Sequence, residues 1–345
     1  MDPEYRIRIL DRLPLGATPE DVKALSFASR KQTIASVLSE SNSVLLFEVG
    51  SEADTRRISV AEDPVEIAGG GRDVAYVACR ASATLDVIDS SGLVKRIDLP
   101  GVPHSLAWNG SFNPARQKIM VACQRLDSTD GIVAVVDEAT HRIVRVLEVG
   151  KQPRGVCLDP QRKHLLVANY GSDSISIIDQ SGTKTLATLP TAGRPWDINV
   201  SWFDPQDIII SLRGGGLLQR LNASTFPPVL SGLTALTTSG QPSKSMTPYV
   251  CMPLDEDHLW LAPDRDSEAI ALVKSNDRDL KQIGYHRLGP KRTDNEGLGR
   301  VAVSSYGLPG KIFIANRERK ELILAEMSRR KSSFVRRKEL IRERL

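Results

Sequence analysis

Short apolar runs alternate with polar turns along the whole chain. The pattern is clearest between Arg154 and Pro195, where the run GVCL precedes the turn DPQRKH and the β-branched run LLVAN. The turn YGSDS then leads to ISIIDQ, and a glycine turn precedes TLATLP. Apolar runs of about four to eight residues, bounded by Gly, Pro, Asp and Ser, are typical of strands. The segment therefore predicts a meander of four antiparallel strands.

The second and third strands of this unit recur seven times, with starts 40 to 53 residues apart. A four-stranded propeller blade takes roughly 40–45 residues, and one meander cannot bury both of its faces alone. Propellers have about four to eight blades. We therefore predict an all-β, seven-bladed β-propeller of four-stranded antiparallel blades. The recurring segments are Ile34–Val49, Val74–Asp89, Ile119–Asp137, Leu165–Asp179, Ile208–Leu221, Leu259–Val273 and Ile312–Glu326.

The first strand of each copy is a further apolar run, and a proline commonly precedes it. Proline fixes φ and lacks an amide donor, so it suits the start of a strand better than its middle. Its recurrence predicts a blade boundary. The runs are Ala24–Phe27, Val65–Ala68, Ser105–Trp108, Gly155–Leu158, Trp196–Val200, Tyr249–Met252 and Arg300–Val303.

Ring closure explains the N-terminal segment. Residues 5–14 have the pattern of an outer strand, and no first three strands precede them. We expect them to pair with Leu322–Glu326 as the outer strand of the seventh blade, which covers an exposed edge. A competing closure would use Ser332–Leu340 instead. The predicted domains are a propeller over 1–326 and a basic C-terminal tail over 327–345.

One segment, QPRGVCLDPQRKHLLVANYGSDSISIID (Gln152–Asp179), resembles the YVTN-type propeller repeat, a WD-like repeat in which a proline and a short strand precede "lyVaN…s.tvsvID". Val74–Asp89 resembles it as strongly, Ile119–Asp137 and Ile312–Glu326 less so, and the fifth and sixth copies weakly. The resemblance implies a propeller over nearly the whole chain. It leaves the chemistry open, because propellers host many unrelated functions.

Composition indicates one large soluble domain. Of the 345 residues, 41% are apolar and 5% aromatic. No stretch approaches ~18 consecutive apolar residues, and MDPEYRIRILDR lacks the apolar centre of a signal peptide. We expect a cytoplasmic monomer with no membrane partner. The four cysteines form no CxxC and the five histidines no metal-binding spacing, so neither a metal nor a cofactor is predicted.

Two sets of residues should meet at one mouth of the central channel. First strands start at this mouth and second strands end there, because the second strand of a meander returns to the face that the first one leaves. Either an anion-binding pocket results, or charged residues simply lie where strands meet solvent. The first set is Glu20, Glu66, His104, Arg154, Trp196, Ser243 and Arg300, and the second is Ser39, Arg80, Gln124, Tyr170, Arg213, Asp264 and Arg317.

A second resemblance favours an enzyme. Pro103-His104-Ser105 and Gln152-Pro153-Arg154-Gly155 are similar to short segments of seven-bladed lactonases of the 6-phosphogluconolactonase type. The resemblance implies that Arg154 holds a carboxylate or phosphate and that His104 transfers protons. The "GPRH" pair of that family has no match here, and Gly193-Arg194-Pro195-Trp196 comes nearest. The candidate ligand-binding residues are Arg154, Arg80, Arg213, Arg300, Arg317, Trp196 and Tyr170, and His104 is the one weak catalytic candidate.

The C-terminal tail concentrates positive charge. Met327–Leu345 holds eight Lys and Arg against two Glu. It is either a solvated extension or a docking element for an acidic protein partner. Nucleic-acid binding is disfavoured, because the blades show no accompanying basic and aromatic face.

The leading functional hypothesis is a binding or scaffold module, an accessory protein in a small-molecule biosynthetic pathway. Its partner would be a protein or an anionic small molecule. The alternative is a lactonase- or lyase-type enzyme that uses the axial pocket on an anionic small molecule.

Overall fold

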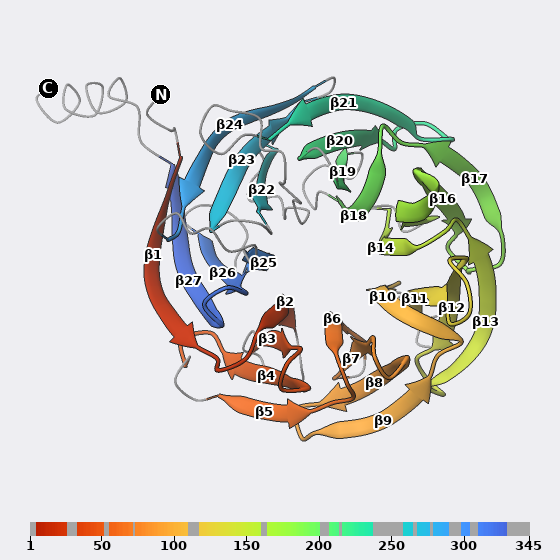
Figure 1. The fold of residues 1–345 in the computed structure, drawn as a ribbon, viewed down its shortest axis with the longest axis horizontal. Coiled ribbons are helices and arrows are strands. Elements are labelled where there is room, and N and C mark those ends of the chain that lie inside the picture. The colour runs from red at the N-terminus through yellow and green to blue at the C-terminus, as the bar shows by residue number, and fades with distance from the viewer. Residues whose placement is uncertain are drawn as a thin grey trace, which may run out of the picture.

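Seven antiparallel sheets surround a central axis like the blades of a propeller (Figure 1). The computed structural model describes residues 5–25, 33–51, 55–71, 73–109, 117–159, 164–200, 207–213, 216–236, 258–264, 268–276, 279–289, 298–303 and 310–329. Six sheets have four described strands and the sixth blade has three. The predicted all-β, seven-bladed propeller is therefore confirmed.

In blades 1 to 5 the first strand along the chain lies nearest the axis and the fourth lies at the rim (Figure 1). Blade 1 is β2 (Pro19–Leu25), β3 (Thr33–Leu38), β4 (Ser43–Glu48) and β5 (Arg56–Ser59). Blade 2 is β6 (Pro64–Gly69), β7 (Val74–Cys79), β8 (Thr84–Asp89) and β9 (Leu93–Asp98). Blade 3 is β10 (Gly101–Trp108), β11 (Lys118–Arg125), β12 (Gly131–Asp137) and β13 (Arg142–Val149).

The remaining blades repeat this order. Blade 4 is β14 (Pro153–Leu158), β15 (His164–Asn169), β16 (Ser174–Asp179) and β17 (Thr185–Pro190), with the short 3-10 turn η2 (Tyr170–Ser172) between β15 and β16. Blade 5 is β18 (Arg194–Val200), β19 (Asp207–Arg213), β20 (Leu217–Asn222) and β21 (Val229–Ala235). Blade 6 is β22 (Leu259–Pro263), β23 (Ala269–Ser275) and β24 (Leu280–Arg287), and blade 7 begins with β25 (Leu298–Val303) and β26 (Gly310–Asn316).

The N-terminal strand closes the ring. The strand β1 (Tyr5–Pro14) pairs antiparallel with β27 (Glu321–Arg329), from Tyr5 opposite Arg329 to Pro14 opposite Glu321. In Figure 1 the red β1 lies beside the blue β27. This confirms the closure predicted for residues 5–14. The competing closure by Ser332–Leu340 is wrong, because β1 already occupies the outer edge of β27.

The boundaries of several elements differ from those predicted. The first strand of blade 1 begins at Pro19 rather than Ala24, and the proline occupies the first pairing position, opposite Leu38. An amide donor is not required there, which suits proline. The strand β27 runs to Arg329, three residues into the predicted tail. The predicted run Tyr249–Met252 and residues 330–345 lie outside the described residues.

Apolar side chains from facing sheets fill the space between blades, and buried polar contacts fix neighbouring blades to each other. The carboxylate of Asp207 in blade 5 accepts a bond from Arg220 Nε at 2.6 Å and also contacts Ser275 of blade 6. The indole Nε1 of Trp260 donates to Ser275 Oγ at 2.9 Å. Buried groups paired in this way hold the blades in register. Among the described residues, no helix has the length and apolar character needed to span a bilayer.

Candidate functional site

A pocket of about 350 Å³ opens at the axial mouth where first strands begin and second strands end. This size is at the lower end of the roughly 300–1,000 Å³ typical of small-molecule sites. Blades 1 to 5 and blade 7 contribute its lining. The lining residues are Glu20, Val65, Arg80, His104, Gln152, Arg154, Tyr170, Trp196, Arg213 and Arg300.

A β-bulge places the lining residue of each inner strand. In blades 1 to 5 the pairing of the first and second strands skips one residue, the one directly after the proline near the start of the first strand. A bulge leaves this residue unpaired and re-aims its side chain, a device common beside functional sites. In this protein it turns the side chain toward the axial mouth. The skipped residues are Glu20, Val65, His104, Arg154 and Trp196.

The bulge also explains one error in the predicted sets. The sequence analysis placed Glu66 at the mouth, but Val65 is the bulged residue and lines the pocket, whereas Glu66 is buried between blades. Gln152, which precedes Pro153, is the other lining residue that was missed. Counting one residue after each proline would have identified Val65.

Among the candidate ligand-binding residues, only Arg317 does not line the pocket. Its Nη2 donates to Glu20 Oε1 at 2.9 Å, so it contacts the lining through that carboxylate. Ser39 also contacts Glu20. Gln124 and Asp264, from the wider predicted set, are absent from the lining, and Ser243 lies outside the described residues.

Two of the lining arginines have carboxylate partners. Arg80 donates to both oxygens of Asp63, at 2.7 and 3.2 Å. Arg300 pairs with Glu66 and lies 3.5 Å from Asp197. These carboxylates therefore balance the positive charge on the side of the pocket formed by blades 7, 1 and 2.

The opposite side of the pocket, formed by blades 4 and 5, holds two guanidinium groups that no described carboxylate neutralises. These are Arg154 and Arg213, and the Nε of Arg154 is buried without a hydrogen-bond partner in the described part of the chain. Burial lowers the pKa of Arg154, and the neighbouring charges of Arg80 and Arg213 lower it further. Buried donors without acceptors are costly. An anion in the pocket would remove that cost.

On this side of the pocket, aromatic rings rather than carboxylates contact the guanidinium groups. The guanidinium carbon of Arg213 lies 4.3 Å from the ring centre of Trp196, and that of Arg154 lies 5.6 Å from it. Arg154 and Arg194 lie 5.9 and 5.5 Å from the ring centre of Tyr170. Cation–π contacts of this kind contribute about 0.5–2 kcal/mol each. These contacts orient the guanidinium groups through their flat faces rather than through their N–H donors.

His104 faces Arg154, whose Nη1 lies 2.6 Å from the imidazole nitrogens. Burial lowers the pKa of His104 to about 3, and the charges of Arg154 and Arg80 contribute to the shift. The imidazole is therefore neutral near pH 7. A neutral ring that accepts a bond from Arg154 has its one proton on the other nitrogen, so it can still donate one hydrogen bond.

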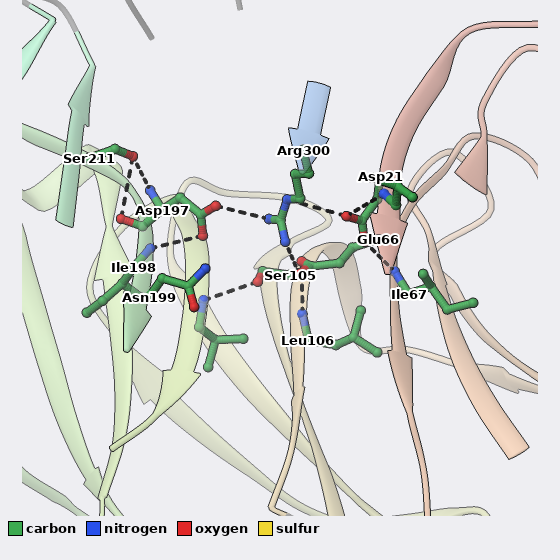
Figure 2. Close-up of polar contacts among 12 residues, drawn as sticks. Asp21, Glu66, Ile67, Ser105, Leu106, Asp197, Ile198, Asn199, Ser211 and Arg300 are labelled. Carbon is green, nitrogen blue, oxygen red and sulfur yellow. Dashed lines mark hydrogen bonds and ion pairs between the residues drawn. The ribbon is translucent and has the colours of Figure 1, made fainter. Parts of the chain in front are cut away.

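Arg300 connects the pocket to a buried acidic cluster made of Asp21, Glu66 and Asp197 (Figure 2). Each acid lies two residues after the proline of its inner strand and directly follows the pocket-lining residue of that strand. Several of their oxygens accept backbone bonds from an adjacent inner strand. Asp21 accepts from Ile67 N–H at 3.1 Å, and Glu66 accepts from Leu106 N–H at 3.3 Å.

Other chemistry finds little support among the described residues. No group of three or more His, Cys, Asp and Glu side chains could hold a metal ion there. Burial raises the pKa of the Cys79 thiol to about 12 and that of Cys157 well above its ordinary value. Neither thiol is poised to act as a nucleophile, because that role requires the thiolate.

No family model matches this chain, and the search of curated proteins finds no match. Many solved structures are similar in fold. They include hydrazine synthase of Kuenenia stuttgartiensis, with a TM-score of 0.68, 15% identity and coverage of 90% of this chain and 95% of that one. A streptogramin B lyase has a TM-score of 0.68, 12% identity and coverage of 94% and 98%. The mitotic checkpoint complex has a TM-score of 0.69, 10% identity and coverage of 93% and 92%.

These likenesses show the fold. A propeller shared by a lyase and by a multi-protein assembly leaves the function to be argued from the site itself.

Proposed function

We propose that this protein is a binding module that captures an anionic small molecule in its axial pocket. The observation that carries the proposal is the pair Arg154 and Arg213, which line a cavity of about 350 Å³ and have no described carboxylate partner. Guanidinium groups donate in a planar fork that matches carboxylate and phosphate oxygens. The two aromatic rings beside them hold this fork in place.

The ligand would lie with its anionic group against blades 4 and 5. Its remaining atoms would extend toward Val65 and toward the charge-balanced side formed by Glu20, Arg80 and Arg300. Such a protein suits an accessory role in a small-molecule pathway, as the sequence suggested. Membership of the YVTN-type family, a cytoplasmic location, a monomeric state and docking through the basic tail stay predictions.

The alternative, a lactonase- or lyase-type enzyme, has the support of the lyases among the structural neighbours, which share its fold at 12% identity or less. The state of His104 disfavours it. A general base works best when its pKa lies near the working pH, and burial with two nearby guanidinium groups holds the pKa of His104 at about 3. The ring suits hydrogen bonding to a ligand better than proton transfer.

Replacing Arg154 or Arg213 by Ala should weaken binding of a small anion by roughly 10- to 100-fold, because a hydrogen bond to a charged group contributes about 1.5–3 kcal/mol. Sulfate is a suitable probe, with titration followed by calorimetry at constant ionic strength. Thermal unfolding of each variant checks that the fold is intact.

The matched control is Arg80→Ala. Arg80 lines the same pocket but pairs with Asp63, so its loss should weaken sulfate binding by less than about threefold, a change of about 0.6 kcal/mol. Equal affinity of wild type, Arg154→Ala and Arg213→Ala would contradict the proposal. So would a wild-type protein that binds no small anion.

A further inference from the structure

Arg300 is shared between the axial pocket and the buried acidic cluster. Arg300 lines the pocket, and its guanidinium pairs with Glu66, lies 3.5 Å from Asp197 and lies 4.0 Å from Asp21. In Figure 2 it reaches between Asp197 on one side and Glu66 with Asp21 on the other. One cation thus serves three carboxylates.

We propose that anion binding in the axial pocket is coupled to proton uptake by the buried cluster of Asp21, Glu66 and Asp197, with Arg300 as the connection. This inference rests on the proposed function of the pocket. It adds that pH regulates ligand affinity: the protein would bind its anionic ligand more tightly in mildly acidic than in mildly alkaline solution.

The cluster holds more negative than positive charge. Asp21 and Glu66 are 0% and 4% exposed, and Asp197 is 4% exposed. Three ionised carboxylates around one guanidinium would leave a buried net charge of −2. Like charges this close cannot all remain ionised without a large cost, so one of them tends to hold a proton.

We assign the proton of the cluster to Glu66. Burial raises its pKa to about 7, and Asp21 and Asp197 push in the same direction, whereas Arg300 and Lys23 oppose the rise. Two other neighbouring groups have defined contacts: the Leu106 N–H of β10 faces Glu66, and the guanidinium of Arg80 is held by Asp63.

An anion in the pocket adds negative charge close to Arg300. The positive potential that keeps Glu66 ionised is then reduced, and its protonated form is favoured. Coupling between two sites is reciprocal, so a protonated Glu66 must favour the anion by the same factor. Sulfate affinity should therefore rise as the pH falls through about 7, where Glu66 takes up its proton.

Sulfate is the probe of choice because it remains a dianion throughout the range from pH 6 to pH 8.5. The dissociation constant of the wild-type protein should fall by roughly two- to fivefold between pH 8 and pH 6, corresponding to a coupling of about half to one pKa unit. Calorimetry at pH 7 in two buffers with different ionisation enthalpies should show net proton uptake on sulfate binding.

Three variants locate the proton. In Glu66→Gln the amide can still accept from Arg300 and Leu106 but cannot titrate, so sulfate affinity should stay at the low-pH value at every pH, without proton uptake. In His104→Gln the uptake should persist, because the imidazole is not its source. Asp197→Asn should shift the pH dependence to lower pH, since it removes a charge that favours protonation of Glu66.

The outcomes separate the two proposals. Wild-type protein that binds sulfate with the same affinity from pH 6 to pH 8.5 overturns the coupling and leaves the anion pocket standing. Loss of proton uptake in His104→Gln, with uptake retained in Glu66→Gln, overturns the assignment to the cluster. Wild-type protein that binds no sulfate overturns both the coupling and the pocket.

Discussion

Deleting residues 1–14 is expected to lower the free energy of unfolding by on the order of 5 kcal/mol, because several buried apolar side chains are lost at about 1.5–3 kcal/mol each. Tyr5 is fully buried in the core of blades 6 and 7, and Ile7 and Ile9 pack against the same cluster. The deletion also exposes the edge of β27, which β1 covers along nine paired positions. Exposed edges invite pairing with other chains.

The measurement is urea unfolding followed by circular dichroism, with sedimentation to detect aggregates. Arg8→Ala is the control within the same strand: Arg8 pairs with Glu326 at the surface, with its side chain 73% exposed, and exposed pairs contribute at most about 1 kcal/mol. Truncation after Arg329 keeps every described contact and provides the second control. If the 1–14 deletion unfolds at the same urea concentration as wild type, closure by β1 is not what holds the ring together.

The repeat made the fold predictable from the sequence. Each blade is built from short strands whose apolar runs and turn residues recur at blade spacing, so the number of blades and the closing role of residues 5–14 could be inferred without any structure. The free outer edge of the last blade demands a partner strand, and the N-terminal segment was the preferred of two candidates, the other being Ser332–Leu340. Boundaries were less certain, as with β2, where the turn-like sequence before Ala24 proved to be strand.

The pocket was only partly predictable. Repeat position alone brought His104, Arg154 and Trp196 to one mouth, because equivalent residues of a ring occupy equivalent places. The bulge at Val65 was not foreseen, so Glu66, the next residue along the strand, was named for the mouth instead.

Charge pairing at the mouth could not be predicted either. Arg317 pairs with Glu20, which is 297 positions away in sequence, and Arg80 pairs with Asp63 from the loop before its blade. Such contacts depend on how the ring closes and on turn geometry. Counting the arginines at the mouth therefore overstates the positive charge available to a ligand. Among the lining arginines, only Arg154 and Arg213 lack a described carboxylate partner.

Replacing Arg300 by Ala is expected to destabilise the protein by about 3–5 kcal/mol near pH 8, because removing one partner of a buried ion pair leaves the other charge uncompensated. Here three carboxylates, Asp21, Glu66 and Asp197, lose the guanidinium between them. Arg80→Ala is the matched control, since that arginine also lines the pocket but pairs at the surface, and its loss should cost less than about 1 kcal/mol.

The dependence of this loss on pH has a definite sign. A carboxyl group whose pKa is higher in the folded than in the unfolded protein stabilises the fold at low pH, and that contribution is lost as the pH rises through the folded value. Burial already raises the pKa of Glu66 to about 7, and removal of Arg300 raises it further. Thermal unfolding should therefore show a larger loss for Arg300→Ala at pH 8 than at pH 5.5.

A second substitution tests whether charge is the cause. Adding Glu66→Gln to Arg300→Ala removes one of the stranded carboxylates and keeps an acceptor for the Leu106 N–H, so part of the lost stability should return at pH 8. If the double variant is less stable than Arg300→Ala, or if the loss is equal at pH 5.5 and pH 8, Arg300 acts through packing rather than charge. The cluster would then not be the group that takes up a proton when the anion binds.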